Sequence, residues 1–137
     1  MDPILITGGA GSVGKQLTNM LLSEGKSVRV FDLPFMDFTD LENLDNVEIV
    51  KGDVTDSNSV TEAVSGVDGV LHLAAILPPN SEKNRETTFA VNVQGTQNIV
   101  DAIKNVSPQA SLVFTSSIST YGDTSGVDSP VTIDHPQ

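Results

Sequence analysis

The sequence predicts a single α/β domain built on a parallel sheet that helices cover on both faces. Short apolar runs alternate with stretches of helical periodicity along the 137 residues. The apolar runs are typical of strands buried on both faces, and their alternation with helices predicts parallel pairing through crossover connections. A chain of this length forms one domain with one sizeable core, so we expect a single domain over residues 1–137.

The first half of the chain contains three expected strands, over residues 4–7, 27–31 and 47–50. The second of these closes on Asp32. A short helix is expected over residues 55–64. Between Leu33 and Leu44 the sequence leaves two alternatives open, a loop or an irregular turn of helix.

The first expected helix follows a glycine-rich turn and ends at Gly25. Its apolar residues recur at intervals of three and four, which predicts one buried face made of Val13, Leu17, Met20 and Leu21.

The second half contains an expected strand over residues 69–73, a long helix over 86–104 and a strand over 111–115. The helical signal rests on the spacing of Phe89, Val93, Thr96, Val100 and Ile103. Beyond the last strand the chain is rich in Gly, Ser, Asp and Pro, and we expect no further element there.

Composition excludes several classes of protein. Seven basic and 18 acidic residues give a net charge of −11, which repels phosphate backbones, so no nucleic-acid partner is expected. No apolar run is long enough to span a bilayer. An apolar strand begins at residue 4, which leaves no room for a signal peptide and predicts a cytoplasmic protein. With no cysteine and two histidines, no metal site is expected.

The turn between the first strand and the first helix has glycines at positions 8, 11 and 14. Glycine lets a ligand approach the backbone, and the helix N-terminus offers unpaired amides and a positive dipole end to a pyrophosphate. The pattern predicts a dinucleotide site, although a purely structural strand–helix junction would also use glycine. The cofactor-binding candidates of this turn are Gly8, Ala10, Gly11, Ser12, Val13 and Gly14.

Asp32 follows Gly14 by 18 residues, at the end of the second strand. A carboxylate there can accept hydrogen bonds from the adenosine ribose hydroxyls and would repel a 2′-phosphate. No Arg or Lys stands in the loop that begins at Leu33, so NAD is favoured over NADP. The alternative is a solvated acid at a strand end.

Five segments together resemble the extended short-chain dehydrogenase/reductases, the family of NAD-dependent sugar-nucleotide epimerases and dehydratases. Residues 7–14 resemble the family's TGxxGxxG turn, and residues 52–54 resemble its adenine-contacting segment. Residues 72–75, 92–96 and 115–122 are similar to three further motifs, the last of them SSxxxYG. The resemblance implies a three-layer Rossmann fold with strand order 3-2-1-4-5.

The resemblance also implies roles for individual residues. The additional cofactor-binding candidates are Leu33, Asp53, Val54, Leu73, Ala74, Ala75, Asn92, Thr115 and Ser116. Ser117 takes the place of the catalytic Ser that hydrogen-bonds the reacting oxygen, with Ser116 and Ser119 as open alternatives. From the residues alone, Asp53 could instead be a turn acid and Asn92 could make a structural hydrogen bond. His72, on a buried strand, is expected to be a core histidine bonded to backbone.

One part of the family pattern is missing from the sequence. The family's chemistry depends on a Tyr-x-x-x-Lys pair, whereas the single tyrosine here, Tyr121, is followed four residues later by Ser125. We therefore expect the NAD-binding part of a longer epimerase, dehydratase or dehydrogenase that transfers hydride on a nucleotide sugar or related hydroxyl substrate. The isolated chain should be inactive. The alternative is a non-catalytic dinucleotide-sensing module, and a homodimer through the helix over 86–104 is also expected.

Overall fold

The computed structural model describes residues 2–126 and 131–134. The five strands lie within two residues of their predicted positions: β1 (Ile4–Thr7), β2 (Val28–Asp32), β3 (Val47–Lys51), β4 (Gly69–His72) and β5 (Ser111–Phe114). The helices are α1 (Ser12–Ser23), α2 (Ser57–Val64), α3 (Asn80–Lys83), α4 (Arg85–Phe89), the π-helix η1 (Ala90–Gly95), α5 (Thr96–Val106) and the 3-10 helix η2 (Ile118–Tyr121).

The strands form one parallel sheet in the order β3-β2-β1-β4-β5, which confirms the predicted topology. The central strand is β1, and its last residue, Thr7, pairs with Phe31 of β2 on one side and His72 of β4 on the other. The carboxyl ends of these three strands therefore meet at one edge of the sheet, where ligands bind in open α/β sheets.

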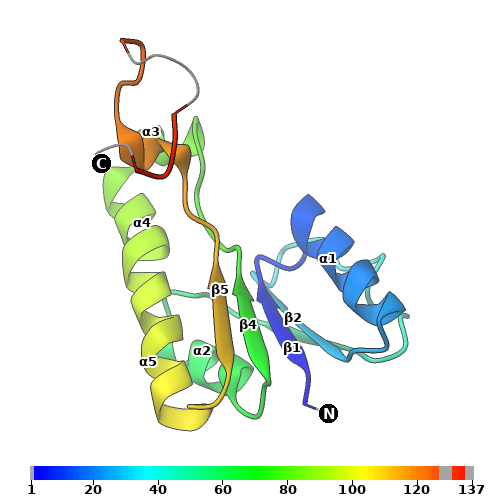
Figure 1. Cartoon of the computed structure of the whole chain (residues 1–137). Helices are drawn as coiled ribbons and strands as arrows, with labels where there is room; N and C mark the ends of the chain where they lie inside the picture. Colours follow the sequence, from blue (N-terminus) through cyan, green and yellow to red (C-terminus); the bar gives the residue numbers. More distant parts are fainter. Residues whose placement is uncertain (1, 127–130, 135–137) are drawn as a thin grey trace.

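Helices cover the two faces of the sheet and complete three layers (Figure 1). The helix α1 lies on one face, and α2 and α5 pack together on the other. The segment from Leu33 to Leu44 is a loop of turns, which decides between the two predicted alternatives. Phe38 and Leu41 of this loop are buried in the same hydrophobic cluster as Ile6 and Val30. Leucines of α1 pack against that cluster, so the loop contributes to the core on the α1 face of the sheet.

The face of α1 differs from its prediction in two positions. Leu17 and Leu21 pack against the core as expected, but Val13 and Met20 are 58% and 60% exposed. Gly14 and Thr18 are the buried residues of the helix instead. The close approach of α1 to the sheet, which needs small side chains, explains why the buried face turns toward them. Gly25 ends the helix as predicted, with a φ of +73° that favours glycine.

The predicted long helix is helical throughout but is not uniform. It runs from Arg85 to Val106 through α4, η1 and α5, so that a π-helical stretch of six residues interrupts it. Of the residues whose spacing predicts this helix, Ile103 is buried, whereas Phe89 and Val93 are 61% and 50% exposed. The spacing therefore predicts the helix correctly, although the residues that define it are not buried along its whole length.

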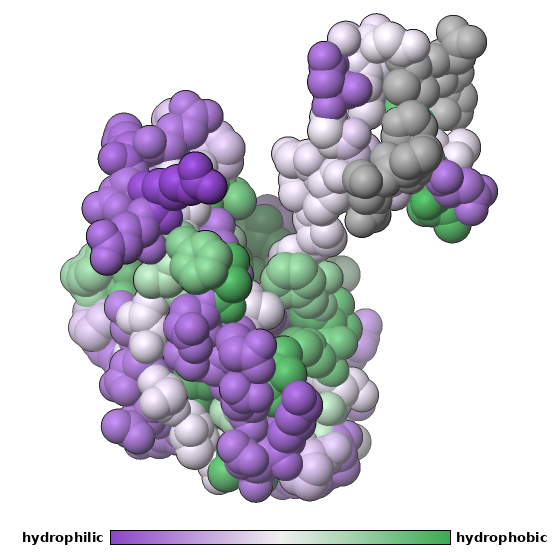
Figure 2. Space-filling model, turned by 90° about the vertical axis from the view of Figure 1, so that its left-hand side faces the viewer, coloured by the Kyte–Doolittle hydropathy of each residue, from purple (hydrophilic) through white to green (hydrophobic). Residues whose placement is uncertain are grey.

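The expectation of no element after β5 is also wrong. Residues Ile118–Tyr121 form η2, because the Ser117 side chain caps it by accepting a hydrogen bond from the Ser119 amide. The strand β5 that leads to it is exposed along its length, including Leu112, Val113 and Phe114. Figure 2 shows a hydrophobic area on the body of the molecule below the point where this C-terminal extension leaves it.

In the part of the chain that the structure describes, no helix is long and apolar enough to cross a membrane. No group of three His, Asp or Glu side chains gathers there as a metal site would require.

Candidate functional site at the carboxyl ends of the strands

The N-terminus of α1 is open toward the carboxyl edge of the sheet. Gly11 is its N-cap, no side chain caps it, and its first turn contains no acidic residue. The first amides of a helix lack partners within the helix and carry the positive end of its dipole. This end of α1 can therefore donate hydrogen bonds to an anion despite the net negative charge of the chain.

Of the four glycines at positions 8 to 14, Gly8, Gly11 and Gly14 serve different purposes. Gly8 has a φ of +69°, and a Cβ there would lie 2.9 Å from the Ala74 amide nitrogen. A Cβ on Gly14 would lie 2.5 Å from the Cα of Gly9. Gly11 is different, because its φ is −71° and its Cβ would meet a single atom, the Gly8 carbonyl oxygen at 3.2 Å. Packing within the chain explains Gly8 and Gly14, whereas Gly11 keeps the approach to the helix N-terminus clear.

Asp32 stands at the end of β2 as predicted and is half-buried. One carboxylate oxygen accepts a hydrogen bond from the Ala10 amide at 3.0 Å, and the other accepts from the Leu33 amide at 2.8 Å. Asp32 is thus bonded into the glycine turn and is not a fully solvated strand-end acid. Each oxygen keeps a further lone pair for a ligand hydroxyl. The bond between Asp32 and the Ala10 amide could not be predicted from the sequence, because it depends on the register that places β2 beside β1.

The backbone after β4 is bonded to Thr7 of β1 through both the Thr7 main-chain carbonyl, which accepts from the Leu73 amide at 3.2 Å, and the Thr7 hydroxyl. The Oγ1 of Thr7 accepts hydrogen bonds from the Leu73 and Ala74 amides, both at 3.2 Å. The Nδ1 of His72 lies 2.6 Å from the same Oγ1, and its Nε2 lies 3.0 Å from the Oγ1 of Thr96. His72 is a buried core histidine as expected, but its ring bonds to hydroxyls, which corrects the predicted backbone partner. No motif or spacing around Thr7 indicated that its hydroxyl would join this group.

The π-helix η1 carries Asn92, whose side chain binds the backbone that follows β4. Its Oδ1 accepts from the Ile76 amide at 2.8 Å, and its Nδ2 donates to the Ile76 carbonyl at 3.0 Å. This is the structural alternative considered for Asn92. The same π-helix ends at Gly95, where a Cβ would lie 2.8 Å from a methyl of Val54. The π-helix η1 therefore carries Asn92 and, through Gly95, also packs closely against Val54.

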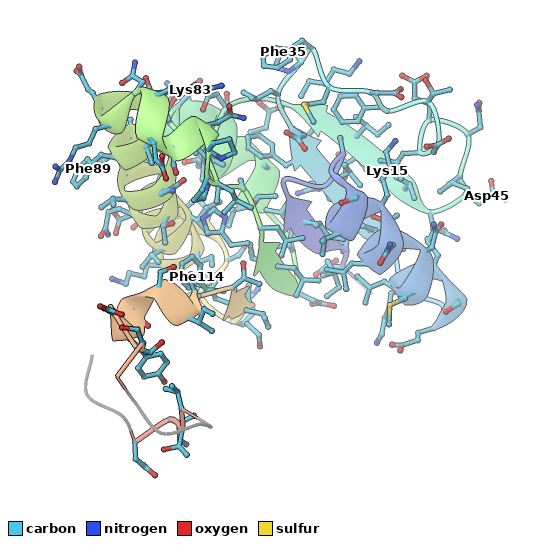
Figure 3. All side chains as sticks on the ribbon, turned by 90° about the horizontal axis from the view of Figure 1, so that it is seen from above. Lys15, Phe35, Asp45, Lys83, Phe89 and Phe114 are labelled. Carbon is cyan, nitrogen blue, oxygen red and sulfur yellow. The ribbon has the colours of Figure 1, made fainter. Side chains whose placement is uncertain are left out.

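The remaining predicted residues lie around this edge. The Oδ1 of Asp53 accepts from the Thr55 amide at 2.8 Å, as the turn-acid alternative requires. Ala75 is exposed, and Thr115, Ser116 and Ser117 are exposed after β5. The view from above in Figure 3 shows Lys15 of α1 and Phe114 of β5 on opposite sides of this edge. The Ser117 hydroxyl is engaged with Ser119, at 3.1 Å between their Oγ atoms.

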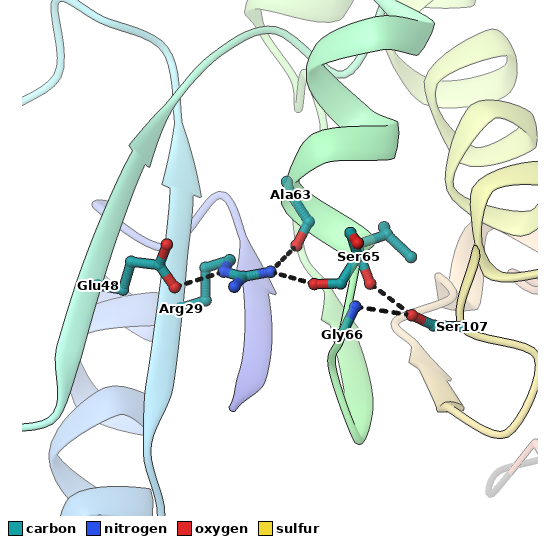
Figure 4. A network of polar contacts seen from close by, with 7 residues as sticks. Arg29, Glu48, Ala63, Ser65, Gly66 and Ser107 are labelled. Carbon is teal, nitrogen blue, oxygen red and sulfur yellow. Dashed lines mark hydrogen bonds and ion pairs between the residues drawn. The ribbon is translucent and has the colours of Figure 1, made fainter. Parts of the chain in front are cut away.

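A surface depression lies away from this edge of the sheet. It has a volume of about 600 Å³ and lies between β3 and α2, lined by Arg29, Glu48, Asn58 and Glu62 among others. Arg29 donates to Glu48 at 2.7 Å and to the carbonyls of Ala63 and Ser65 at 2.8 and 2.7 Å (Figure 4). These bonds satisfy the C-terminal carbonyls of α2, so we assign this region to stability. The candidate site rests on the amides and glycines of the opposite edge.

The model of the 3-beta hydroxysteroid dehydrogenase/isomerase family matches residues 5–132. The chain belongs to this family. One curated relative of this chain, mouse 3 beta-hydroxysteroid dehydrogenase type 7, is 36% identical over 123 residues. The match covers 86% of this chain and 33% of the relative. CDP-paratose 2-epimerase of Salmonella typhi is 34% identical over 128 residues, which cover 88% of this chain and 38% of that protein.

A solved structure gives the same result for the fold. A short-chain dehydrogenase/reductase superfamily protein from Agrobacterium tumefaciens, crystallised with bound NAD, is 36% identical and superposes with a TM-score of 0.78. The match covers 97% of this chain and 38% of that one. The predicted membership of the short-chain dehydrogenase/reductases, with their NAD-dependent epimerases, is confirmed. The chain spans about a third of the length of these curated relatives.

Proposed function

We propose that residues 1–137 are the NAD-binding part of an enzyme that transfers hydride between NAD and a carbon bearing a hydroxyl group. The observation that carries this proposal is the glycine turn, where Gly11 leaves space that packing within the chain does not need. The open N-terminus of α1 stands directly behind it and can bind the pyrophosphate. The bound NAD of the Agrobacterium protein supports the choice of cofactor.

Asp32 would bind the adenosine ribose. Its carboxylate is held at the edge of the sheet by the Ala10 and Leu33 amides, with lone pairs left for the ribose hydroxyls. A 2′-phosphate would meet this negative charge, and no Arg or Lys stands between Leu33 and Leu44 to offset it. We therefore propose NAD rather than NADP. Asp53 and Val54 would border the adenine, and Leu73 to Ala75 would border the second ribose.

The chemistry would need groups that the 137 residues do not contain. Ser117 is the proposed hydrogen-bond donor to the reacting oxygen, and no Tyr-x-x-x-Lys pair accompanies it in this sequence. We propose that this chain alone binds cofactor without turnover. One relative is named for a hydroxysteroid and another for the sugar of CDP-paratose. Both compounds carry secondary hydroxyl groups. The proposed substrate is accordingly a secondary alcohol, with a nucleotide sugar as the class that the sequence motifs favour.

We also propose that the protein dimerises through α4 and η1. Phe89 and Val93 lie four residues apart on this helical segment. The side chain of Phe89 is 61% exposed and that of Val93 is 50% exposed. Large apolar side chains placed together in this way mark an interaction surface.

Calorimetric titration with NAD and NADP tests the cofactor assignment. We expect NAD to bind in the micromolar range and NADP to bind more weakly. Gly11→Ala should weaken NAD binding by about tenfold or more, because its methyl group would stand where the pyrophosphate approaches. Asp32→Asn should narrow the preference for NAD over NADP, because the repelling charge is removed.

Gly126→Ala is the matched control for Gly11→Ala. A Cβ at Gly126 would meet nothing within 4 Å, and its φ is not in the left-handed region. This variant should bind NAD as the unchanged protein does. Absence of NAD binding by the folded chain would refute the proposed function, and equal effects of the two substitutions would refute the role given to the glycine turn.

A further inference from the structure

His72 connects three elements of the candidate site without touching the place proposed for the cofactor. It is 1% exposed at the carboxyl end of β4, and its ring stacks on Phe114 of β5 at 5.8 Å between centroids. Its two nitrogens meet the hydroxyls of Thr7 on β1 and Thr96 on α5. These contacts join the strand before the glycine turn to the helix that carries Asn92.

The donors and acceptors around His72 fix the position of its proton. The Thr96 hydroxyl donates to the Asn92 carbonyl at 2.8 Å, so its oxygen must accept from an N–H on the Nε2 of His72. A neutral ring then has no proton on Nδ1, which accepts from the Thr7 hydroxyl at 2.6 Å. The opposite tautomer would leave the Thr7 hydroxyl proton without an acceptor and would compete with the Thr96–Asn92 bond.

This arrangement determines what Thr7 can do. Because its hydroxyl proton points to His72, both lone pairs of its oxygen face the Leu73 and Ala74 amides. The Ala74 amide in turn lies where a side chain on Gly8 would be, at 2.9 Å from the Cβ position. The Leu73 amide also donates to the Thr7 carbonyl, so it is the bond to the Ala74 amide, next to the glycine turn, that depends on an acceptor at the Nδ1 of His72.

We propose that His72 is a positioning residue for cofactor binding, which holds the backbone after β4 against the glycine turn while it is neutral and releases it when Nδ1 takes up a proton. This inference rests on the proposed function. A protonated Nδ1 would donate toward an oxygen that already receives two amide protons, so the Thr7 bonds would have to rearrange.

No charged group contacts the His72 ring in the described part of the chain, so nothing around it would stabilise the protonated form. Thr7, Thr96 and Phe114 carry no charge. Within β1, β4, β5, η1 and α5, all fully described, the titratable residues besides His72 are Asp101 and Lys104 of α5, which are exposed. Asp101 accepts a hydrogen bond from Gln97. Burial alone lowers the pKa of His72 from its ordinary value of 6.5.

The direction of the pH dependence follows from that pKa. Because the folded protein binds the proton less well than the unfolded chain, the stabilisation is complete above pH 6.5 and declines as the pH falls toward the folded-state pKa. NAD binding, which requires the neutral form, should weaken only as the pH falls through the folded-state pKa itself. Below the folded-state pKa of His72, each pH unit should raise the Kd for NAD by about tenfold, the slope for one linked proton.

Two substitutions distinguish the hydrogen bond at Nδ1 of His72 from the one at Nε2. His72→Asn places an oxygen near the position of Nδ1 and cannot titrate, so it should keep the Thr7 bond and bind NAD within about threefold of the unchanged protein at pH 8. Its affinity should stay constant from pH 8 to pH 5.5. His72→Gln keeps a donor near the position of Nε2 but lacks the acceptor at Nδ1, and should weaken NAD binding at every pH. His135→Gln, at the other histidine of the sequence, should retain the pH profile of the unchanged protein.

Nuclear magnetic resonance of the cofactor-free protein tests the inference separately from NAD binding. The nitrogen shifts of His72 should show the Nε2–H tautomer. The protection factor of the Ala74 amide, which corrects for the intrinsic pH dependence of hydrogen exchange, should fall as the ring protonates. An Nδ1–H tautomer, an unchanged protection factor on protonation, or a His72→Asn variant with the pH profile of the unchanged protein would each overturn the proposal. If the protein fails to bind NAD at pH 8 while the tautomer and exchange behave as expected, the proposed function fails and the positioning of this backbone by His72 stands.

Discussion

Replacing Gly14 with alanine would place a methyl group between α1 and the glycine turn. The added Cβ would lie 2.5 Å from the Cα of Gly9, 2.6 Å from its carbonyl oxygen and 2.7 Å from the carbonyl oxygen of Gly8. Non-bonded carbon atoms sit about 3.5–4.0 Å apart, so the backbone of the turn would have to move by about 1 Å. All three obstructing atoms belong to the main chain, and no side-chain rotation can relieve the contact.

The energetic cost follows from this geometry. Overpacking of a dense region costs about 1–3 kcal/mol, and obstruction by backbone puts Gly14→Ala at the upper end of that range. Alanine regains about 1 kcal/mol over glycine within a helix. We therefore expect the free energy of unfolding to fall by about 2 kcal/mol, as measured by urea denaturation with circular dichroism.

Gly11→Ala is the matched comparison for this measurement. Its Cβ would approach the Gly8 carbonyl oxygen at 3.2 Å and no other atom within 4 Å, and alanine is a poorer N-cap than glycine. We expect a loss of less than about 1 kcal/mol in unfolding free energy, with the main effect on NAD affinity. Equal stabilities of the Gly14→Ala variant and the unchanged protein would refute the close packing of α1 on the turn.

Two further predictions concern the rest of the chain. Arg29→Met should lower the free energy of unfolding by about 2–3 kcal/mol, because it removes charge-assisted hydrogen bonds to the Ala63 and Ser65 carbonyls. Glu48→Gln should lower it by less than about 1 kcal/mol, because the Glu48 side chain is 55% exposed. Urea denaturation checks both values, and equal losses would contradict the capping role of Arg29. Phe89→Ser should shift the protein from dimer to monomer in sedimentation equilibrium with little change in stability, and an unchanged mass would contradict the proposed dimer surface.

The strands and their parallel pairing could be predicted from the apolar runs and the helical connections between them, whereas the order of the strands was implied by the resemblance to the family. The glycine spacing and Asp32 were also placed correctly at the carboxyl edge of the sheet. Both depend on short stretches of sequence. Hydrophobic runs and glycines report their own environment directly, so this level of the fold needs no knowledge of distant contacts.

The errors share a physical origin, since they depend on what lies across from a residue. The spacing of Val13 and Met20 predicts a face but does not tell whether another part of the chain covers it. The widened turn of η1 arises from an unusual hydrogen-bonding pattern that leaves no periodic signature. The bonds of Asp32 to Ala10 and of Thr7 to His72 join residues 22 and 65 positions apart, which only the assembled sheet brings together.

The central place of β1 has a consequence for synthesis of the protein on the ribosome. Thr7 and His72, which bond across the sheet, are 65 residues apart. At roughly 5–20 residues per second, roughly 3 to 13 s separate their translation. During that interval one hydrogen-bonding edge of β1 has no strand to pair with, so the nascent chain passes through a stage in which its innermost strand is open to other polypeptides.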